Sequence, residues 1–278
     1  MIDFIKSKTP INICDIGASP IDKTDFIQTL FDNCNSKIIG FEPNIDEFKK
    51  LERSNPKKKF YNYALGDGKD KTLNICKAPG MSSFLEPNYD YLKIFHSFEE
   101  WSEIVSKQEV TTKKLNDVDE ILDFIKLDVQ GYEYEILKYG QKKIKEAKVI
   151  QIETSPFPIY KNEKSMSEII KLLENHGFML HMFNKINTRS FKPMVVANNK
   201  NLGINHLFQL DCVMVKNFKE IKLLDKESLM KLILIMFYSF KSYDFVDYLI
   251  TILDDKFKTS FIEKYRALHK DFKINKKY

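Results

Sequence analysis

Cysteine is scarce in this chain, and its four cysteines are widely separated. Cys14, Cys34, Cys76 and Cys212 form no C-x-x-C pair and have no close histidine companion. A zinc site built from locally spaced ligands is therefore excluded. Cys14 and Cys212 lie inside apolar runs, where a thiol behaves as a small core residue. We expect buried, reduced thiols in a cytoplasmic protein.

Long apolar runs are also missing. The longest, residues 232–238, is far shorter than the ~20 residues needed to cross a bilayer. Residues 1–10 (MIDFIKSKTP) contain no apolar segment of the kind found in signal peptides. We therefore expect no membrane span. No internal repeat or low-complexity segment is evident.

What is present fits a globular protein. A chain of 278 residues with 43% apolar and 13% aromatic residues can bury a large core, which excludes disorder as its main state. The net charge is +5 and the pI is about 8.7, but the lysines are scattered rather than clustered. This pattern gives weak support to a nucleic-acid-binding module, and we expect no nucleic-acid partner.

Short β-type runs alternate with helical stretches over the first two thirds of the chain. Strands are expected at residues 11–16, 37–42, 60–65, 123–128, 149–153, 178–183 and 207–215, with an extra one at 73–77. Helices are expected at 22–31, 44–53, 132–139 and 165–176, and the last two strands as a hairpin. This alternation predicts an α/β fold with a doubly wound, mostly parallel sheet. In such sheets ligands bind beyond the carboxyl ends of the strands.

The pattern changes near Lys219. Residues 228–253 and 260–272 carry apolar and aromatic side chains at helical spacing. We expect a C-terminal helical annex, residues 218–278, beside a sheet domain of residues 1–217. The apolar stripe of the annex favours core packing or a homodimer contact over a substrate lid.

The first two strand ends carry the first ligand signals. Gly17 allows a tight turn after the first strand, but the other glycines of a G-x-G-x-x-G dinucleotide fingerprint are absent. Asp15 beside that turn suits a ligand with an ammonium group. Glu42 follows the second strand, where a carboxylate can accept both ribose hydroxyls of a nucleoside. S-adenosylmethionine combines a nucleoside with a charged amine and has no diphosphate, and Asp67 after the third strand could lie near its adenine.

Two more carboxylates follow neighbouring strands. Asp128 and Glu153 emerge at ends of the sheet that should lie side by side. Such a pair can orient and deprotonate a hydroxyl, or hold a divalent cation. Each alone could equally be a helix cap or an ion-pair partner, and metal dependence stays open.

These segments together resemble the FkbM-type methyltransferase family. The resemblance is carried, in chain order, by residues 15–18 (DIGA), 40–43 (GFEP), 64–67 (ALGD), 82–83 (SS), 125–133 (IKLDVQGYE) and 209–213 (QLDCV). It runs from about residue 11 to 216, and the segment around Asp128 is its most specific part. The chain departs from the family in the first loop, where Ser19 and Pro20 replace the frequent Asn and second Gly.

The resemblance implies a seven-stranded Rossmann-like sheet and an S-adenosylmethionine-dependent O-methyltransferase that acts on a hydroxyl of a nucleotide-activated sugar or glycan. Asp128 and Glu153 are then the catalytic candidates. The cofactor-binding candidates are Asp15, Gly17, Ala18, Glu42, Asn44, Asp67 and Ser83. Tyr89, Tyr91 and Trp101 could stack on sugar faces, although packing is the commoner role of such residues. The alternatives are a nicotinamide-dependent oxidoreductase, disfavoured by the missing glycines, and a nucleic-acid-binding module.

Overall fold

A seven-stranded sheet forms the centre of the molecule. The computed structural model describes residues 2–18, 25–51 and 55–269. The strand order is β3 (Lys58–Tyr61), β2 (Ser36–Phe41), β1 (Ile11–Ile16), β7 (Phe124–Leu127), β8 (Val149–Thr154), β10 (Leu207–Lys216) and β9 (Phe178–Thr188). All neighbours are parallel except β10, which is antiparallel to β8 and β9. The predicted doubly wound, mostly parallel sheet is confirmed.

Helices cover both faces of this sheet. On one face lie α1 (Asp25–Asn33), α9 (Lys226–Tyr238) and α10 (Tyr243–Phe257), and on the other α5 (Glu133–Lys138), α6 (Gln141–Glu146) and α7 (Met166–Glu174). Side chains alternate along each strand, so Ile13 enters the first core and Cys14 the second. Cys14, Cys76 and Cys212 are buried free thiols, and Cys34 is half-buried.

Local sequence explains several helix ends. Asn44 caps α2 (Ile45–Lys50) by accepting hydrogen bonds from the N–H groups of Asp46 and Glu47. Ser165 and Glu168 form a capping box at the start of α7. Gly177 follows this helix with a φ of 82°, the left-handed conformation that glycine adopts at helix C-termini. The predicted helix at 22–31 is α1 from Asp25 onward; residues 22–24 lie outside the described residues.

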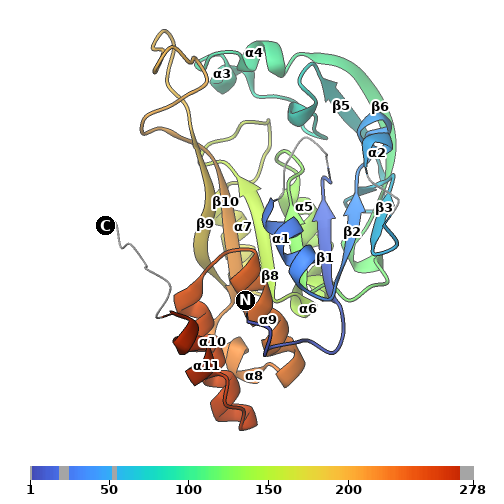
Figure 1. The fold of residues 1–278 in the computed structure, drawn as a ribbon. Coiled ribbons are helices and arrows are strands. Elements are labelled where there is room, and N and C mark those ends of the chain that lie inside the picture. The colour runs from blue at the N-terminus through green and yellow to red at the C-terminus, as the bar shows by residue number, and fades with distance from the viewer. Residues whose placement is uncertain (1, 19–24, 52–54, 270–278) are drawn as a thin grey trace.

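A smaller sheet lies beyond the carboxyl ends of β1 and β2, in the upper part of Figure 1. It contains β4 (Ala64–Leu65), β6 (Ile104–Lys113) and β5 (Asp70–Cys76), in that order. The strand expected at 60–65 is therefore two strands, since the chain bends at Asn62, whose amide donates to the carbonyls of Glu42 and Pro43. The extra strand at 73–77 is β5. Short helices complete the region: η1 (Pro79–Met81), α3 (Tyr89–Leu92), α4 (Phe98–Trp101) and η2 (Leu115–Asp117).

The C-terminal helices gather at the opposite end of the molecule (Figure 1). They are α8 (Phe218–Leu223), α9, α10 and α11 (Ile262–His269). The stretch 228–253, expected to be helical, contains two helices, and between α9 and α10 Lys241 has a left-handed φ of 51°. Residues 229–238 of α9 are all buried, and they share one core with strand residues such as Ile13 and Phe124. The apolar stripe of the annex is thus buried within one chain, while the homodimer and the domain boundary at 217 stay predictions.

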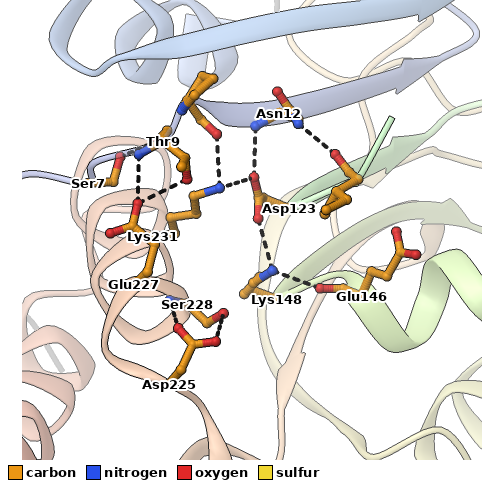
Figure 2. Close-up of polar contacts among 12 residues, drawn as sticks. Ser7, Thr9, Asn12, Asp123, Glu146, Lys148, Asp225, Glu227, Ser228 and Lys231 are labelled. Carbon is orange, nitrogen blue, oxygen red and sulfur yellow. Dashed lines mark hydrogen bonds and ion pairs between the residues drawn. The ribbon is translucent and has the colours of Figure 1, made fainter. Parts of the chain in front are cut away.

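A buried ionic cluster connects the annex to the sheet (Figure 2). Asp123 is fully buried and lies 2.9 Å from both Lys148 Nζ and Lys231 Nζ. The backbone N–H of Asn12 also donates to Asp123, and Lys231 donates to the carbonyl of Pro10. A buried carboxylate needs such partners. The cluster therefore fixes α9 against the amino-terminal ends of β1 and β7.

Candidate active site

A cavity of about 360 Å³ opens at the carboxyl ends of the central strands. Its floor comes from the ends of β1, β2, β7 and β8, one wall from η1 and β5, and the other from β9 and β10. It is where the doubly wound topology predicts a ligand site.

Gly17 brings the ends of β1 and β7 into direct contact. Its φ is 80°, and a Cβ added there would lie 1.9 Å from the carbonyl oxygen of Asp128. The N–H groups of Gly17 and Ala18 both donate to the carbonyl of Phe41. Only glycine fits this turn. Gly17 lines the cavity, Ala18 is not among its lining residues, and Ser19 and Pro20 lie outside the described residues.

Glu42 and Asn44 lie together on the cavity wall after β2. Glu42 is 7% exposed, and its Oε1 accepts a hydrogen bond of 2.8 Å from the backbone N–H of Asn44. No other described residue donates to this carboxylate. Burial raises the pKa of Glu42 to about 7, against the lowering effect of the Asn44 N–H. The carboxylate thus retains acceptor capacity toward a ligand.

Glu47 is a lining residue that the sequence analysis missed. It is 5% exposed on α2, its Oε1 pairs with Lys50 at 2.6 Å, and its buried Oε2 has no partner among the described residues. Its place in the first turn after the Asn44 cap was the available signal, since that turn directly follows Glu42 in the chain. An unsatisfied buried carboxylate oxygen needs a partner, and a ligand in the cavity could supply a donor to it.

Asp128 and Glu153 meet at the cavity floor, as predicted. Gln130 joins them: its Nε2 lies 2.9 Å from Asp128 Oδ1 and 2.8 Å from Glu153 Oε2. Gln209 Nε2 also donates to Glu153 Oε2, at 2.9 Å. Burial, and then neighbouring carboxylates led by Asp128, raise the pKa of Glu153 well above its usual value. These surroundings favour the protonated form of Glu153 more strongly than water does.

Gln130 itself is held from three sides. Its backbone has a left-handed φ of 57°, its carbonyl accepts a 2.6 Å hydrogen bond from Ser83 Oγ, and its Oε1 accepts one from the buried hydroxyl of Tyr160. Ser83, predicted as a cofactor residue, lines the cavity and holds Gln130 in place. Gln130, Gln209 and Tyr160 were not identified as site residues from the sequence.

Asp15 and Asp67 are predicted site residues that do not line the cavity. Lys126 Nζ lies 3.3 Å from Asp15 Oδ1 and 3.6 Å from Asp128 Oδ2, and all three side chains are nearly buried. Asp67 pairs with Lys71 at 3.1 Å, and hydrogen bonds from Lys71 and the Lys69 N–H lower the pKa of Asp67 despite some desolvation. Asp15 is thus linked to Asp128 through Lys126, whereas Asp67 pairs with a residue outside the cavity lining.

Aromatic stacking on a ligand is not supported for the three predicted residues. Tyr91 stacks on Phe157, Trp101 packs edge-on against Phe98, and the Tyr89 hydroxyl donates to the carbonyl of Ser102. None of the three lines the cavity.

Across residues 2–18, 25–51 and 55–269, no cluster of three or more His, Cys, Asp or Glu could hold a metal ion. In the same ranges, no helix has the length and apolar character needed to span a membrane.

The Methyltransferase FkbM domain family matches residues 15–180, more than half of the 278-residue chain. The chain belongs to this methyltransferase family. Its donor is therefore S-adenosylmethionine, which decides against the nicotinamide-dependent oxidoreductase and the non-enzymatic nucleic-acid-binding module. The seven-stranded sheet is the S-adenosylmethionine-dependent methyltransferase fold.

Solved structures resemble this methyltransferase only distantly. An FkbM methyltransferase from Methylobacillus flagellatus KT is 12% identical, with a TM-score of 0.41 over 74% of this chain and 43% of that one. A TehB-like methyltransferase from Corynebacterium glutamicum is also 12% identical, with a TM-score of 0.36 over 78% and 85%. This chain thus matches less than half of the Methylobacillus chain. No curated protein matches the chain.

The cavity of the methyltransferase fits its cofactor. S-adenosylmethionine carries a sulfonium and an ammonium charge, and four acidic residues line the cavity: Glu42, Glu47, Asp128 and Glu153. Glu42 and Gly17 line the same cavity, and the glycine adds no side chain to its turn. The buried, unpartnered oxygen of Glu47 adds an acceptor on the same wall.

Proposed function

We propose that this methyltransferase is an O-methyltransferase that modifies a hydroxyl of a sugar, carried by a nucleotide or a glycan. The cavity supports this through one juxtaposition: the Asp128–Gln130–Glu153 group adjoins a wall of amide and basic side chains, of which Gln209 donates directly to Glu153. Gln209, Asn187, Lys185 and Arg189 form that wall. Such side chains match an acceptor rich in hydroxyl groups far better than an apolar one.

Glu42 is the proposed ribose ligand. A carboxylate that accepts two hydroxyl protons forms charge-assisted hydrogen bonds, each worth roughly 1.5–3 kcal/mol. Asn44 fixes Glu42 through its backbone N–H. Gly17 and Ala18 keep the adjacent turn tight, and Ser83 holds Gln130 in place. Asp15 acts on Asp128 through Lys126, which lies close to both carboxylates. Asp67 is two residues after Leu65, which lines the cavity.

Asp128 is the proposed proton acceptor. S-adenosylmethionine supplies an electrophilic methyl group on its sulfonium. The acceptor hydroxyl becomes a good nucleophile only as its proton is removed, and a positioned base contributes about 10²–10⁴-fold. Burial and neighbouring carboxylates raise the pKa of Glu153, which suits it to donate a hydrogen bond to the acceptor oxygen, and Asp128 takes the proton. Gln130 holds the two carboxyl groups in place. Alignment of the oxygen with the methyl group in a closed site supplies most of the rate.

The proposal is tested by incubating the protein with S-adenosylmethionine and a panel of nucleotide sugars, free glycosides and non-sugar alcohols. Mass spectrometry should find one added methyl group on a sugar, and fragmentation should assign it to an oxygen. Methylation of a nitrogen, or of non-sugar alcohols only, would overturn the sugar O-methylation.

A further inference from the structure

The charges that line the cavity are segregated. All four acidic residues stand on the β2, β7 and β8 side, whereas the cationic lining residues, Lys185 and Arg189, stand on β9 and directly after it. Lys185 and Asn187 are two positions apart on a regular stretch of β9, opposite Asp211 and Gln209, so they share one face of the sheet.

Arg189 is a desolvated cation without a carboxylate partner among the described residues. Its Nη1 donates to the carbonyl of Thr188 at 2.9 Å, and its buried Nε has no acceptor. The guanidinium carbon lies 5.6 and 5.4 Å from the ring centroids of Phe98 and Phe208. Burial lowers the pKa of Arg189. By contrast, the exposed Arg266 makes a two-pronged ion pair with Asp247.

An unpaired, half-buried guanidinium in a cavity needs an anion to offset its desolvation. Aromatic rings on one side hold its plane in place, which prepares it for the bidentate binding of phosphate or carboxylate oxygens. The cationic cofactor fits the acidic side of the cavity. The basic side is left for the acceptor.

We propose that Lys185 and Arg189 form an anion subsite that binds a phosphate group of the acceptor, so that the substrate is a phosphorylated sugar such as a nucleotide-activated one. This inference rests on the proposed function and narrows its substrate class. In this arrangement the sugar ring lies between the phosphate and Asp128. Asn187 and Gln209 supply amide contacts to that ring.

The anionic oxygens at this subsite could instead belong to the methionine carboxylate of the cofactor, and calorimetry distinguishes the two sources. UDP-glucose, glucose 1-phosphate and uncharged methyl glucoside are titrated into protein saturated with S-adenosylhomocysteine. Separately, S-adenosylhomocysteine is titrated into each variant. The two cavity variants are Arg189→Met and Lys185→Met, and the control is Lys192→Met. Because Lys185 is exposed, its substitution removes a charge without touching the core. Lys192 lies on the same loop, pairs with Glu99 and does not line the cavity.

We expect at least one phosphorylated probe to bind, and its affinity to fall about 10-fold or more in Arg189→Met and in Lys185→Met. The control should bind it as wild type does, and all three variants should keep wild-type affinity for S-adenosylhomocysteine. Unchanged probe affinity in both cavity variants, no phosphorylated probe binding at all, or weakened S-adenosylhomocysteine binding in Arg189→Met would overturn the subsite. If the probe binds through Arg189 but no sugar is ever methylated, the proposed function fails and the anion subsite stands.

Discussion

Gln130 Nε2 lies 2.8 Å from Glu153 Oε2, and the same nitrogen lies 2.9 Å from Asp128 Oδ1. One neutral amide thus holds two carboxyl groups that belong to neighbouring strands. Two like charges this close would repel each other in a buried site. The amide donates to both carboxyl groups and so keeps the pair compact.

Replacing Gln130 should therefore damage catalysis more than cofactor binding. In Gln130→Ala we expect the turnover number to fall by about 10–100-fold, as for other lost positioning groups, while S-adenosylmethionine affinity stays within about threefold. Steady-state kinetics and calorimetry measure the two effects. Gln141→Ala, at the exposed start of α6 and outside the cavity lining, is the control. Wild-type turnover in Gln130→Ala would show that the amide is dispensable.

Glu42 should make cofactor binding sensitive to pH. Its pKa is about 7 in the ligand-free protein, and the ribose requires the ionised acceptor. Affinity should be full above about pH 8 and fall as the pH drops through 7, by at most tenfold per pH unit. Calorimetry between pH 5.5 and 8.5 (roughly one to two units on either side of the pKa) measures it.

Substitution tests the same residue at fixed pH. Glu42→Ala should weaken S-adenosylmethionine binding by at least ~10-fold at pH 8, and Glu42→Gln should remove most of the pH dependence. A Glu42→Ala protein with wild-type affinity would remove Glu42 from the cofactor site.

The buried acids should also make the free protein less stable as the pH rises. Burial raises the pKa of Glu133 from its ordinary 4.5 to about 8. Between those values the folded state keeps a proton that the unfolded state releases, so the free energy of unfolding falls as pH rises.

Glu133→Gln should flatten that fall. The contribution removed is on the order of 1–4 kcal/mol between pH 5 and 8, and urea unfolding at several pH values measures it. The exposed Glu86→Gln is the control. Identical pH profiles for Glu133→Gln and wild type would refute a raised pKa at Glu133.

The cluster in Figure 2 predicts how strongly the annex is coupled to the sheet. Lys231→Met removes one of the two cations at the buried carboxylate of Asp123. Breaking a buried ion pair in this way costs about 3–5 kcal/mol, so we expect a clear drop in unfolding free energy. Lys226→Met, at an exposed site of the same helix, should have little effect.

Deletion after Asn217 tests the annex as a whole. It would uncover the core that α9 shares with β1 and β7, and exposed apolar patches of that size promote aggregation. A truncated chain that stays soluble, monomeric and active would show that the annex is dispensable.

Much of the central sheet could be predicted because its strands are apolar and buried on both faces. The strand-end acids Glu42, Asp128 and Glu153 could be found for the same reason: each directly follows or ends such a run. By contrast β6, residues 104–113, escaped prediction since few of its side chains are buried, among them Val110 and Thr112. The break between α9 and α10 contains neither glycine nor proline, so the sequence gives no signal for it. Lys241 adopts the left-handed backbone conformation there.

Other parts of the site depend on tertiary structure alone. Gln130 bridges Asp128 to Glu153, which lies 23 residues further along the chain. Arg189 follows β9 directly, and its place at the cavity depends on the antiparallel pairing of β9 with β10. No local pattern encodes such distances. Asp15 differs from these residues, because the sequence did identify it as an acidic side chain beside the first turn. The sequence did not predict that Asp15 pairs with Lys126.

The most direct test of the account is the fate of an isotopically labelled methyl group in the wild type and in Asp128→Asn. The protein is incubated with labelled S-adenosylmethionine and phosphorylated sugars, and NMR identifies the labelled product. We predict label on a sugar oxygen, formed about 100-fold or more slowly by Asp128→Asn, with S-adenosylmethionine affinity unchanged by calorimetry. Equal rates in the two proteins, or label on any atom other than oxygen, would contradict it.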